Sequence, residues 1–186
     1  SYETRQKQIL HVSCFVEPTK NVFCILRAIK KVSLKRRDFV LNLVGDGPDF
    51  KKTVAYAQEI EVEDFVCFLG EQPPKKVSEK LSVSDFFLLF SLYENMPVVI
   101  SESLSAGVPV IAPKTGGIPE MVNESNGLLV PVAEEEKLVE AIEWMLDHFY
   151  EYEQENIRKE AQKRFSYESV GKKILEVYQT CITNNV

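Results

Sequence analysis

The stretch Ser91–Glu120 holds the residues best suited to chemistry: two carboxylates, a helix start and a Gly-Gly turn between apolar runs. Glu94 and Glu102 are eight positions apart, with Pro97 between them. A helix that opens near Pro97 or Val98 would present unpaired backbone N–H groups, which attract anions. The stretch therefore predicts a site that welcomes a phosphate and has two carboxylates close to it.

The preceding segment explains how this site would be positioned. Asp85–Phe90 is a continuous apolar run of strand length, which is typical of a strand buried on both faces of a parallel sheet. Glu94 would then lie in the loop just beyond the carboxyl end of that strand, where open α/β sheets bind their ligands. Proline suits the first helical position because its missing N–H would be unpaired there anyway. Glu102 would lie about one turn into the helix, within reach of the crevice.

Strands alternate with helices along the whole chain. Strands are expected at Ile9–Ser13, Phe39–Val44, Phe65–Leu69, Asp85–Phe90, Val108–Ala112 and Gly127–Val130. Helices are expected over Asn21–Val32, with Asn21 as the cap, over Pro48–Ile60, around Val77 and Leu81, after Pro97, and over Ile118–Val122, Glu134–His148, Glu151–Lys163 and Tyr167–Cys181. This order predicts an α/β fold: a Rossmann-like, doubly wound parallel sheet of about six strands, with helices on both faces and a C-terminal helical tail.

Composition narrows the class of protein. A chain of 186 residues with 45% apolar composition is one domain that can bury a full core. A net charge of -6 argues against nucleic acid as a partner. The four cysteines show no paired spacing, which indicates reduced thiols and a cytoplasmic location. No apolar segment approaches the roughly 20 residues that a membrane span requires.

One basic cluster stands out against this acidic background: Lys30, Lys31, Lys35, Arg36 and Arg37. We interpret it as a solvated helix end whose positive charge complements the helix dipole. The alternative is attraction to an anionic membrane surface, which would give the full-length protein a peripheral contact with the inner face of a membrane.

Five motifs in a fixed order carry a family resemblance: GDGP at 45–48, VCFLGEQP at 66–73, the glutamate pair, TGGIPE at 115–120 and GLLVP at 127–131. In this order they resemble the C-terminal, donor-binding half of the family-four retaining glycosyltransferases, which belong to group 1 and have the GT-B fold. The resemblance covers about residues 9–178. It implies a single nucleotide-sugar-binding domain over residues 1–186, with residues 165–186 as the crossover and tail helix. The N-terminal acceptor-binding domain would be absent from this chain, which starts almost directly on a strand.

The resemblance also implies a ligand, a nucleoside-diphosphate sugar, and a role for each carboxylate. Glu102 resembles the glutamate that accepts hydrogen bonds from both ribose hydroxyls, since two carboxylate oxygens can serve a vicinal diol. Glu94 resembles the glutamate near the transferred sugar, close to the reacting carbon. Leu69, at the start of the loop that runs to Pro74, would lie near the base.

The remaining donor contacts would come from backbone. The resemblance implies that Asn95, Met96, Pro97 and Val98 offer backbone N–H groups to the sugar and the distal phosphate. In that family a glycine commonly follows the first glutamate. Asn95 is the residue that best tolerates a left-handed backbone after glycine, so we expect the turn to be kept. Gly116 and Gly117 are expected to form a tight turn against the same crevice, and Glu120 to complement the N-terminus of the short helix that follows.

The segment SCFVEPTKN at 13–21 departs from the family pattern. The family carries an Arg and then a Lys in this loop, which together neutralise the leaving diphosphate. This chain keeps Lys20 but has Cys14 where the Arg is expected. Because a preorganised charge at a leaving group can contribute roughly 3 kcal/mol, the replacement bears on activity more than on donor binding.

The function that these observations predict is donor binding in a retaining glycosyltransferase that transfers a hexosyl unit to a saccharide or lipid-linked acceptor, as in polysaccharide biosynthesis, with Glu94 and Lys20 as catalytic residues. No metal and no cofactor is expected, since neither His11 nor His148 has metal-ligand spacing. Two alternatives remain. One is another GT-B enzyme, such as a phosphorylase or a nucleotide-sugar epimerase, and the other is a non-catalytic nucleotide-binding or interaction module.

Overall fold

The computed structural model describes residues 5–183 and contains one six-stranded parallel sheet in the order β3-β2-β1-β4-β5-β6. The strands are β1 (Lys7–Val12), β2 (Phe39–Val44), β3 (Val66–Gly70), β4 (Phe86–Leu88), β5 (Val110–Pro113) and β6 (Gly127–Val130). The helices are α1 (Val22–Ser33), α2 (Phe50–Glu59), α3 (Pro74–Ser82), α4 (Val98–Ser105), α5 (Ile118–Met121), α6 (Glu135–His148), α7 (Gln154–Phe165) and α8 (Tyr167–Thr183). The predicted fold class is confirmed.

The strand order creates a switch point at the middle of the sheet. The chain builds outward from β1 through β2 to β3, then crosses back and adds β4, β5 and β6 on the other side of β1. The loops after β1 and β4 therefore turn away in opposite directions, which leaves a crevice between the carboxyl ends of these two strands. Glu94 lies in the loop after β4, as the sequence predicts.

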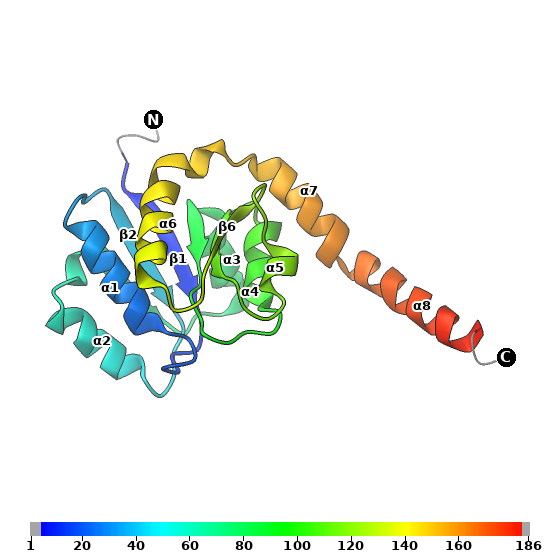
Figure 1. Ribbon diagram of the computed structural model, residues 1–186, viewed down its shortest axis with the longest axis horizontal. Helices are drawn as coiled ribbons and strands as arrows, with labels where there is room; N and C mark the ends of the chain where they lie inside the picture. The colour runs from blue at the N-terminus through cyan, green and yellow to red at the C-terminus, as the bar shows by residue number, and fades with distance from the viewer. Residues whose placement is uncertain (1–4, 184–186) are drawn as a thin grey trace.

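Helices cover both faces of this sheet (Figure 1). One core joins the sheet to α1 and α6, and a second core joins it to α3, α4 and α7. The apolar run after Asp85 contributes side chains to both cores. Phe86, Leu88 and Phe90 belong to the first core, whereas Phe87 and Leu89 belong to the second. Alternate side chains of a strand point to opposite faces, so a continuous apolar run is what a doubly covered strand needs.

Several helix starts differ from expectation. Helix α2 begins at Phe50 rather than at Pro48, because Gly47 and Pro48 form a turn in which Phe50 N–H donates to the Gly47 carbonyl at 3.1 Å. Asn21 occupies the N-cap position of α1, but its side chain makes no capping bond. The Glu17 carboxylate does so instead, and accepts from Phe23 N–H at 3.1 Å.

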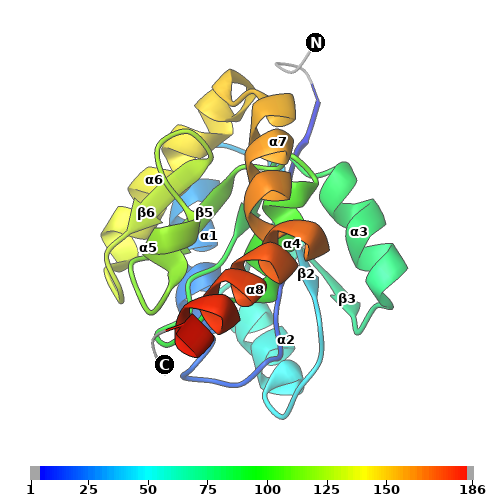
Figure 2. The same ribbon diagram turned by 90° about the vertical axis from the view of Figure 1, so that its right-hand side faces the viewer.

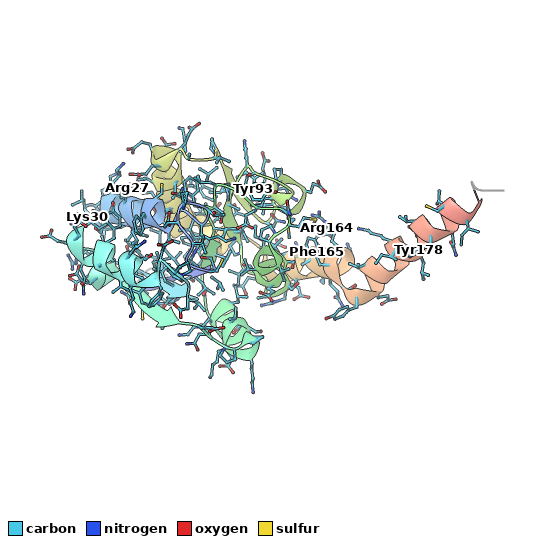
Figure 3. All side chains as sticks on the ribbon, turned by 90° about the horizontal axis from the view of Figure 1, so that it is seen from below. Arg27, Lys30, Tyr93, Arg164, Phe165 and Tyr178 are labelled. Carbon is cyan, nitrogen blue, oxygen red and sulfur yellow. The ribbon has the colours of Figure 1, made fainter. Side chains whose placement is uncertain are left out.

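The basic cluster lies at the C-terminal end of α1, as interpreted: Lys30 and Lys31 are in the last turn of the helix, and no side chain of the cluster is buried. All five side chains are ion-paired: Lys30 with Glu61, Lys31 with Glu135 and Glu136, Lys35 with Glu143, Arg36 with Asp38 and Asp147, and Arg37 with Asp64. Most of these acids lie on α6, which packs beside α1. Figure 3 shows Arg27 and Lys30 along the same helix, and Arg27 adds a further ion pair to Glu135.

The last helix leaves the body of the domain. Helix α7 packs on α4, whereas α8 extends away from the sheet (Figures 1 and 2). Figure 3 shows Arg164 and Phe165 at the junction and Tyr178 on the extended part. The large apolar side chains of α8 are exposed, namely Tyr167, Val170, Ile174, Leu175, Val177, Tyr178 and Ile182. Across residues 5–183, none of the helices combines the length and the apolar character that a membrane crossing would need.

Candidate functional site

Backbone hydrogen bonds connect the loops that follow separate strands at the crevice between β1 and β4. Leu92 N–H, after β4, donates to the Thr19 carbonyl of the loop after β1 at 2.9 Å. Phe15 N–H, after β1, donates to Asp46 of the loop after β2 at 3.0 Å, and Gly117 N–H, after β5, donates to the Asn95 carbonyl at 2.6 Å. Gly45 N–H, after β2, also donates to the Gly70 carbonyl at 2.8 Å, so backbone bonds link the loops after β1, β2, β4 and β5 and the end of β3 into one connected group.

Lys20 and Glu94 form the centre of the site. The Lys20 Nζ atom lies 2.6 Å from Glu94 Oε1, although the two residues are 74 positions apart. The side chains are only 18% and 10% exposed, so their attraction is weakly screened. The ammonium has three donors and this pair uses one of them, which leaves two for a phosphate. The structure therefore brings the two predicted catalytic residues into direct contact.

The Gly-Gly turn supports Glu94 from the other side. Gly116 has a φ of 53°, and a Cβ atom there would collide with the Glu94 carbonyl oxygen. A Cβ atom on Gly117 would lie 2.8 Å from Met96 Cγ and 2.9 Å from the Asn95 carbonyl oxygen. The expected tight turn against the crevice is confirmed, and its physical reason is the close approach of two backbones.

Two expectations about the loop after Glu94 are wrong. Asn95 is not left-handed, because the only non-glycine residues with positive φ among residues 5–183 are Asn21, Glu61 and Ala133. Pro97 has no N–H group, so it cannot donate to a phosphate as expected. It is the N-cap of α4, with Val98 as the first helical residue. The backbone donors of the predicted set are therefore Asn95, Met96 and Val98 only.

Glu102 faces a different part of the site. It is exposed on α4 and lines a pocket of about 300 Å³ between α3 and α4, with Pro74, Val77, Ser78 and Leu81 on the other wall. The start of α3 follows the loop that begins at Leu69, where the Gln72 amide donates to the Leu69 carbonyl at 2.7 Å. Glu94 precedes α4, whereas Glu102 lies within it, and the pocket at Glu102 extends along α4 to Ser105 and Ala106.

His11 lies in β1, close enough to Lys20 and Glu94 for their charges to affect its pKa. Its ring is fully buried in β1, with Nδ1 2.8 Å from the Leu88 carbonyl oxygen and Nε2 2.7 Å from Ser13 Oγ. Burial lowers the pKa of His11 from 6.5 to about 4, so the ring is neutral at pH 7. Nδ1–H then donates to Leu88 and Nε2 accepts from the Ser13 hydroxyl. The sequence identified His11 as structural but gave no sign that it lies under Lys20 and Glu94.

The cysteines differ in their surroundings. All four thiols are free, and Cys14 is exposed in the loop after β1. Cys24 is buried, and burial raises the pKa of its thiol to about 11, with the neighbouring Glu135 carboxylate adding to the effect. Within residues 5–183 no group of three or more His, Cys, Asp or Glu side chains is placed to hold a metal ion.

Comparison with known proteins places this chain in a family. Residues 2–164 match the model of the glycosyl transferases group 1 family. The chain is 32% identical over 177 residues to N-acetyl-alpha-D-glucosaminyl L-malate synthase of Bacillus anthracis, covering 94% of this chain and 45% of that protein. It is also 32% identical to the GDP-mannose-dependent alpha-mannosyltransferase of Corynebacterium glutamicum, over 79% of this chain and 35% of that protein.

Solved structures agree on the fold. The apo form of the lipopolysaccharide outer core galactosyltransferase WaaB superposes with a TM-score of 0.84 at 22% identity, over 95% of this chain and 50% of that one. HepE from Anabaena in complex with UDP superposes with a TM-score of 0.83 at 23% identity, over 96% and 50%. The chain thus spans about half the length of the relatives that it matches. The match to the family model over most of its length shows that this chain belongs to the glycosyl transferases group 1 family.

Proposed function

We propose that this chain is the donor-binding half of a retaining glycosyltransferase and binds a nucleoside-diphosphate sugar for transfer of a hexosyl unit to a saccharide or lipid-linked acceptor. The observation that carries the proposal is the contact between Lys20 and Glu94 beside the N-terminus of α4, at the switch point of the sheet. A cation and unpaired helix N–H groups suit a diphosphate, and a carboxylate beside them suits the hydroxyls of a sugar.

Each side chain then has a role that its position supports. Glu102, in the groove between α3 and α4, accepts hydrogen bonds from the ribose hydroxyls, and the loop at Leu69 lies toward the base. Lys20 and the start of α4 stabilise the leaving diphosphate. Glu94 contacts the transferred sugar near its reacting carbon and holds Lys20 in place meanwhile.

The ligand class follows from the site together with the relatives. One structural relative was solved with UDP-glucose, and another relative is named as dependent on GDP-mannose. Their shared chemistry is a nucleoside-diphosphate sugar. The contacts proposed for Glu102 and Lys20 involve only the ribose and the diphosphate, so they serve any base. No metal or cofactor is part of the proposal.

The missing wall of the site is proposed to be an N-terminal acceptor domain. Helix α8 exposes its apolar side chains, and a cavity of about 680 Å³ lies between it and Met96, which follows the catalytic loop. A second domain seated on α8 would cover these side chains and close the cleft over the sugar. Peripheral membrane contact through the basic cluster is the weaker proposal, because each of its five cations already has a carboxylate partner.

Calorimetric titration with UDP, GDP and ADP, with and without an attached sugar, tests the donor site. We expect one base to bind and Glu102→Ala to weaken that binding about 10-fold or more, because hydrogen bonds to a charged acceptor contribute roughly 1.5–3 kcal/mol. Glu168→Ala is the matched control, since Glu168 is exposed in the first turn of α8. Equal affinities for the unmodified chain and Glu102→Ala would remove Glu102 from the site.

A second function has one observation in its favour. Cys14 is exposed where a cation is expected, and the remaining cation is neutralised by Glu94. A non-catalytic nucleotide-binding module would tolerate both features. The full-length protein separates the two functions: sugar transfer supports the enzyme, whereas nucleotide binding without turnover of any offered acceptor supports the module.

A further inference from the structure

The pairing of the central strands predicts which residues meet at the crevice. Leu10 pairs with Phe87, and Phe87 pairs with Val110, so these three residues form one row across β1, β4 and β5. All three belong to the core under α4. A row displaced by four residues along each strand faces the same side of the sheet, because side chains alternate with a period of two.

Counting four residues from that row gives Cys14, Ser91 and Lys114. The strands themselves end at Val12, Leu88 and Pro113, so these three residues follow the carboxyl ends of three neighbouring strands. Just beyond the row, Leu92 is bonded to the loop after β1. Cys14 and Lys114 therefore lie at the carboxyl edge of the sheet, on either side of the strand that Ser91 follows.

The charges along this row are uneven. Cys14 is exposed and brings no cation, and the only cation after β1, Lys20, is neutralised by Glu94 at 2.6 Å. Lys114 is also exposed, and within residues 5–183 it forms no ion pair with a carboxylate. It is thus a free positive charge two strands away from the position that lacks one.

Ser91 adds an independent sign of an unfilled polar site. Its side chain is fully buried, and its Oγ atom has no hydrogen-bond partner in the structure. Buried hydroxyls almost always have a partner, so one that lacks it marks a place for a water molecule or a ligand group. This hydroxyl lies in the row between Cys14 and Lys114.

We infer that Lys114 supplies the second positive charge for the diphosphate of the donor, in place of the cation that Cys14 does not provide. The inference rests on the proposed donor site. Adjacent strands are about 4.8 Å apart, so Lys114 starts one strand away from the crevice above β4, and its flexible four-carbon stem spans that width. Beside the diphosphate Lys20 and Glu94 cancel, so Lys114 adds the one net positive charge there.

The test compares phosphates with and without Lys114. UDP, GDP and ADP, and then UMP, GMP and AMP, are titrated calorimetrically into the chain and its variants. We expect Lys114→Ala to weaken binding of the preferred diphosphate about 10-fold, as loss of a charge-assisted hydrogen bond requires, and to weaken the monophosphate less. Lys114→Arg should retain most of the affinity. Lys172→Ala is the matched control, because it removes the same charge from the exposed tail.

The decisive variant places a positive charge at position 14 when the charge at position 114 has been removed. Cys14→Arg in the Lys114→Ala background should regain the lost affinity. No gain there would overturn the claim that the two positions serve the same phosphates, and a Lys114→Ala affinity equal to that of Lys172→Ala would overturn the role of Lys114 itself. Binding that is lost in Glu102→Ala but unchanged in Lys114→Ala would leave the donor site intact. If the unmodified chain binds none of the three diphosphates at millimolar concentration, the proposed function falls together with the inference.

Discussion

His11 illustrates how a neutral buried ring supports a charged pair. Both ring nitrogens have partners, and desolvation holds the pKa of His11 near 4, well below the 6.5 of an exposed histidine. Protonation would place a cation in this desolvated site, where the Lys20 charge opposes it and the Glu94 charge and the Leu88 carbonyl only partly offset the cost. The unfolded chain can bind that proton more readily than the folded chain can, so folding and protonation compete.

The consequence is a pH-dependent loss of stability. Above pH 6.5 the ring is neutral in both the folded and the unfolded state. Between pH 6.5 and pH 4 the unfolded state binds more protons than the folded state. The free energy of unfolding therefore decreases as the pH is lowered through this window. A depression of this size corresponds to about 3 kcal/mol at most. We expect His11→Gln to flatten the pH dependence of urea unfolding over that window. His148→Gln is the control, because that ring is only half-buried and stacks on Trp144, away from β1, and an equal flattening by both variants would contradict the assignment to His11.

Gly116 is the residue whose replacement should most disturb the loop between β4 and α4, which contains Glu94. Its left-handed backbone costs roughly 1–2 kcal/mol for an alanine, and the added methyl group would collide with the Glu94 carbonyl oxygen. We expect Gly116→Ala to lower the free energy of unfolding by at least that amount and to weaken donor binding, as measured by urea unfolding and calorimetry. Gly171→Ala, whose Cβ atom would have no neighbour within 4 Å, should leave both unchanged or slightly stabilise α8. Equal stability of the two variants would show that the loop can move aside freely.

At the scale of elements, the two C-terminal helices differ in what they contribute. Helix α7 buries Ile157 and Ala161 in the core under α4, whereas α8 has almost no buried side chain. Since apolar burial contributes about 25 cal/mol per Å², stability should come from α7 and little from α8.

Removal of residues 167–186 should therefore leave the thermal midpoint of the chain within about 2 °C of its original value. The truncated chain should also bind nucleoside diphosphates as before, since Glu102, Lys20 and α4 lie outside the removed segment. Differential scanning calorimetry measures the first outcome and titration the second. A larger loss of stability would mean that α8 packs on the domain in solution.

At the scale of the whole molecule, the proposed function makes this chain one wall of a cleft. Its relatives are about twice as long, and the crevice at the switch point, the exposed side chains of α8 and the cavity beside Met96 lie where a second domain would complete the site. Enclosure matters for transfer, because excluding water strengthens the interaction of Lys20 with a leaving diphosphate and prevents hydrolysis of the donor.

We therefore expect the isolated chain to bind donor and to transfer no sugar. The measurement is release of nucleoside diphosphate and formation of a glycosylated product, with the full-length protein as the positive control. Transfer by the isolated chain at a rate comparable to that of the full-length protein would show that the acceptor site lies within these 186 residues.

The sequence by itself determined the architecture and predicted the members of the site. Apolar runs such as Phe86–Leu88, alternating with helical periodicity, predicted a doubly wound sheet, because burial on both faces imposes that pattern locally. The order of the motifs placed Glu94, Glu102 and the Gly-Gly turn at one sheet edge. Predictions about single backbone groups failed at Asn95, where a local preference yielded to the packing around it, and at Pro97, because proline has no N–H group.

Only the tertiary structure decided which side chains meet. The contact between Lys20 and Glu94, the row of Cys14, Ser91 and Lys114, and the pairing of the basic cluster with α6 all join residues far apart in the chain. The physical reason is that such contacts depend on the order and register of the strands, and these are fixed when the sheet assembles rather than by neighbours in sequence.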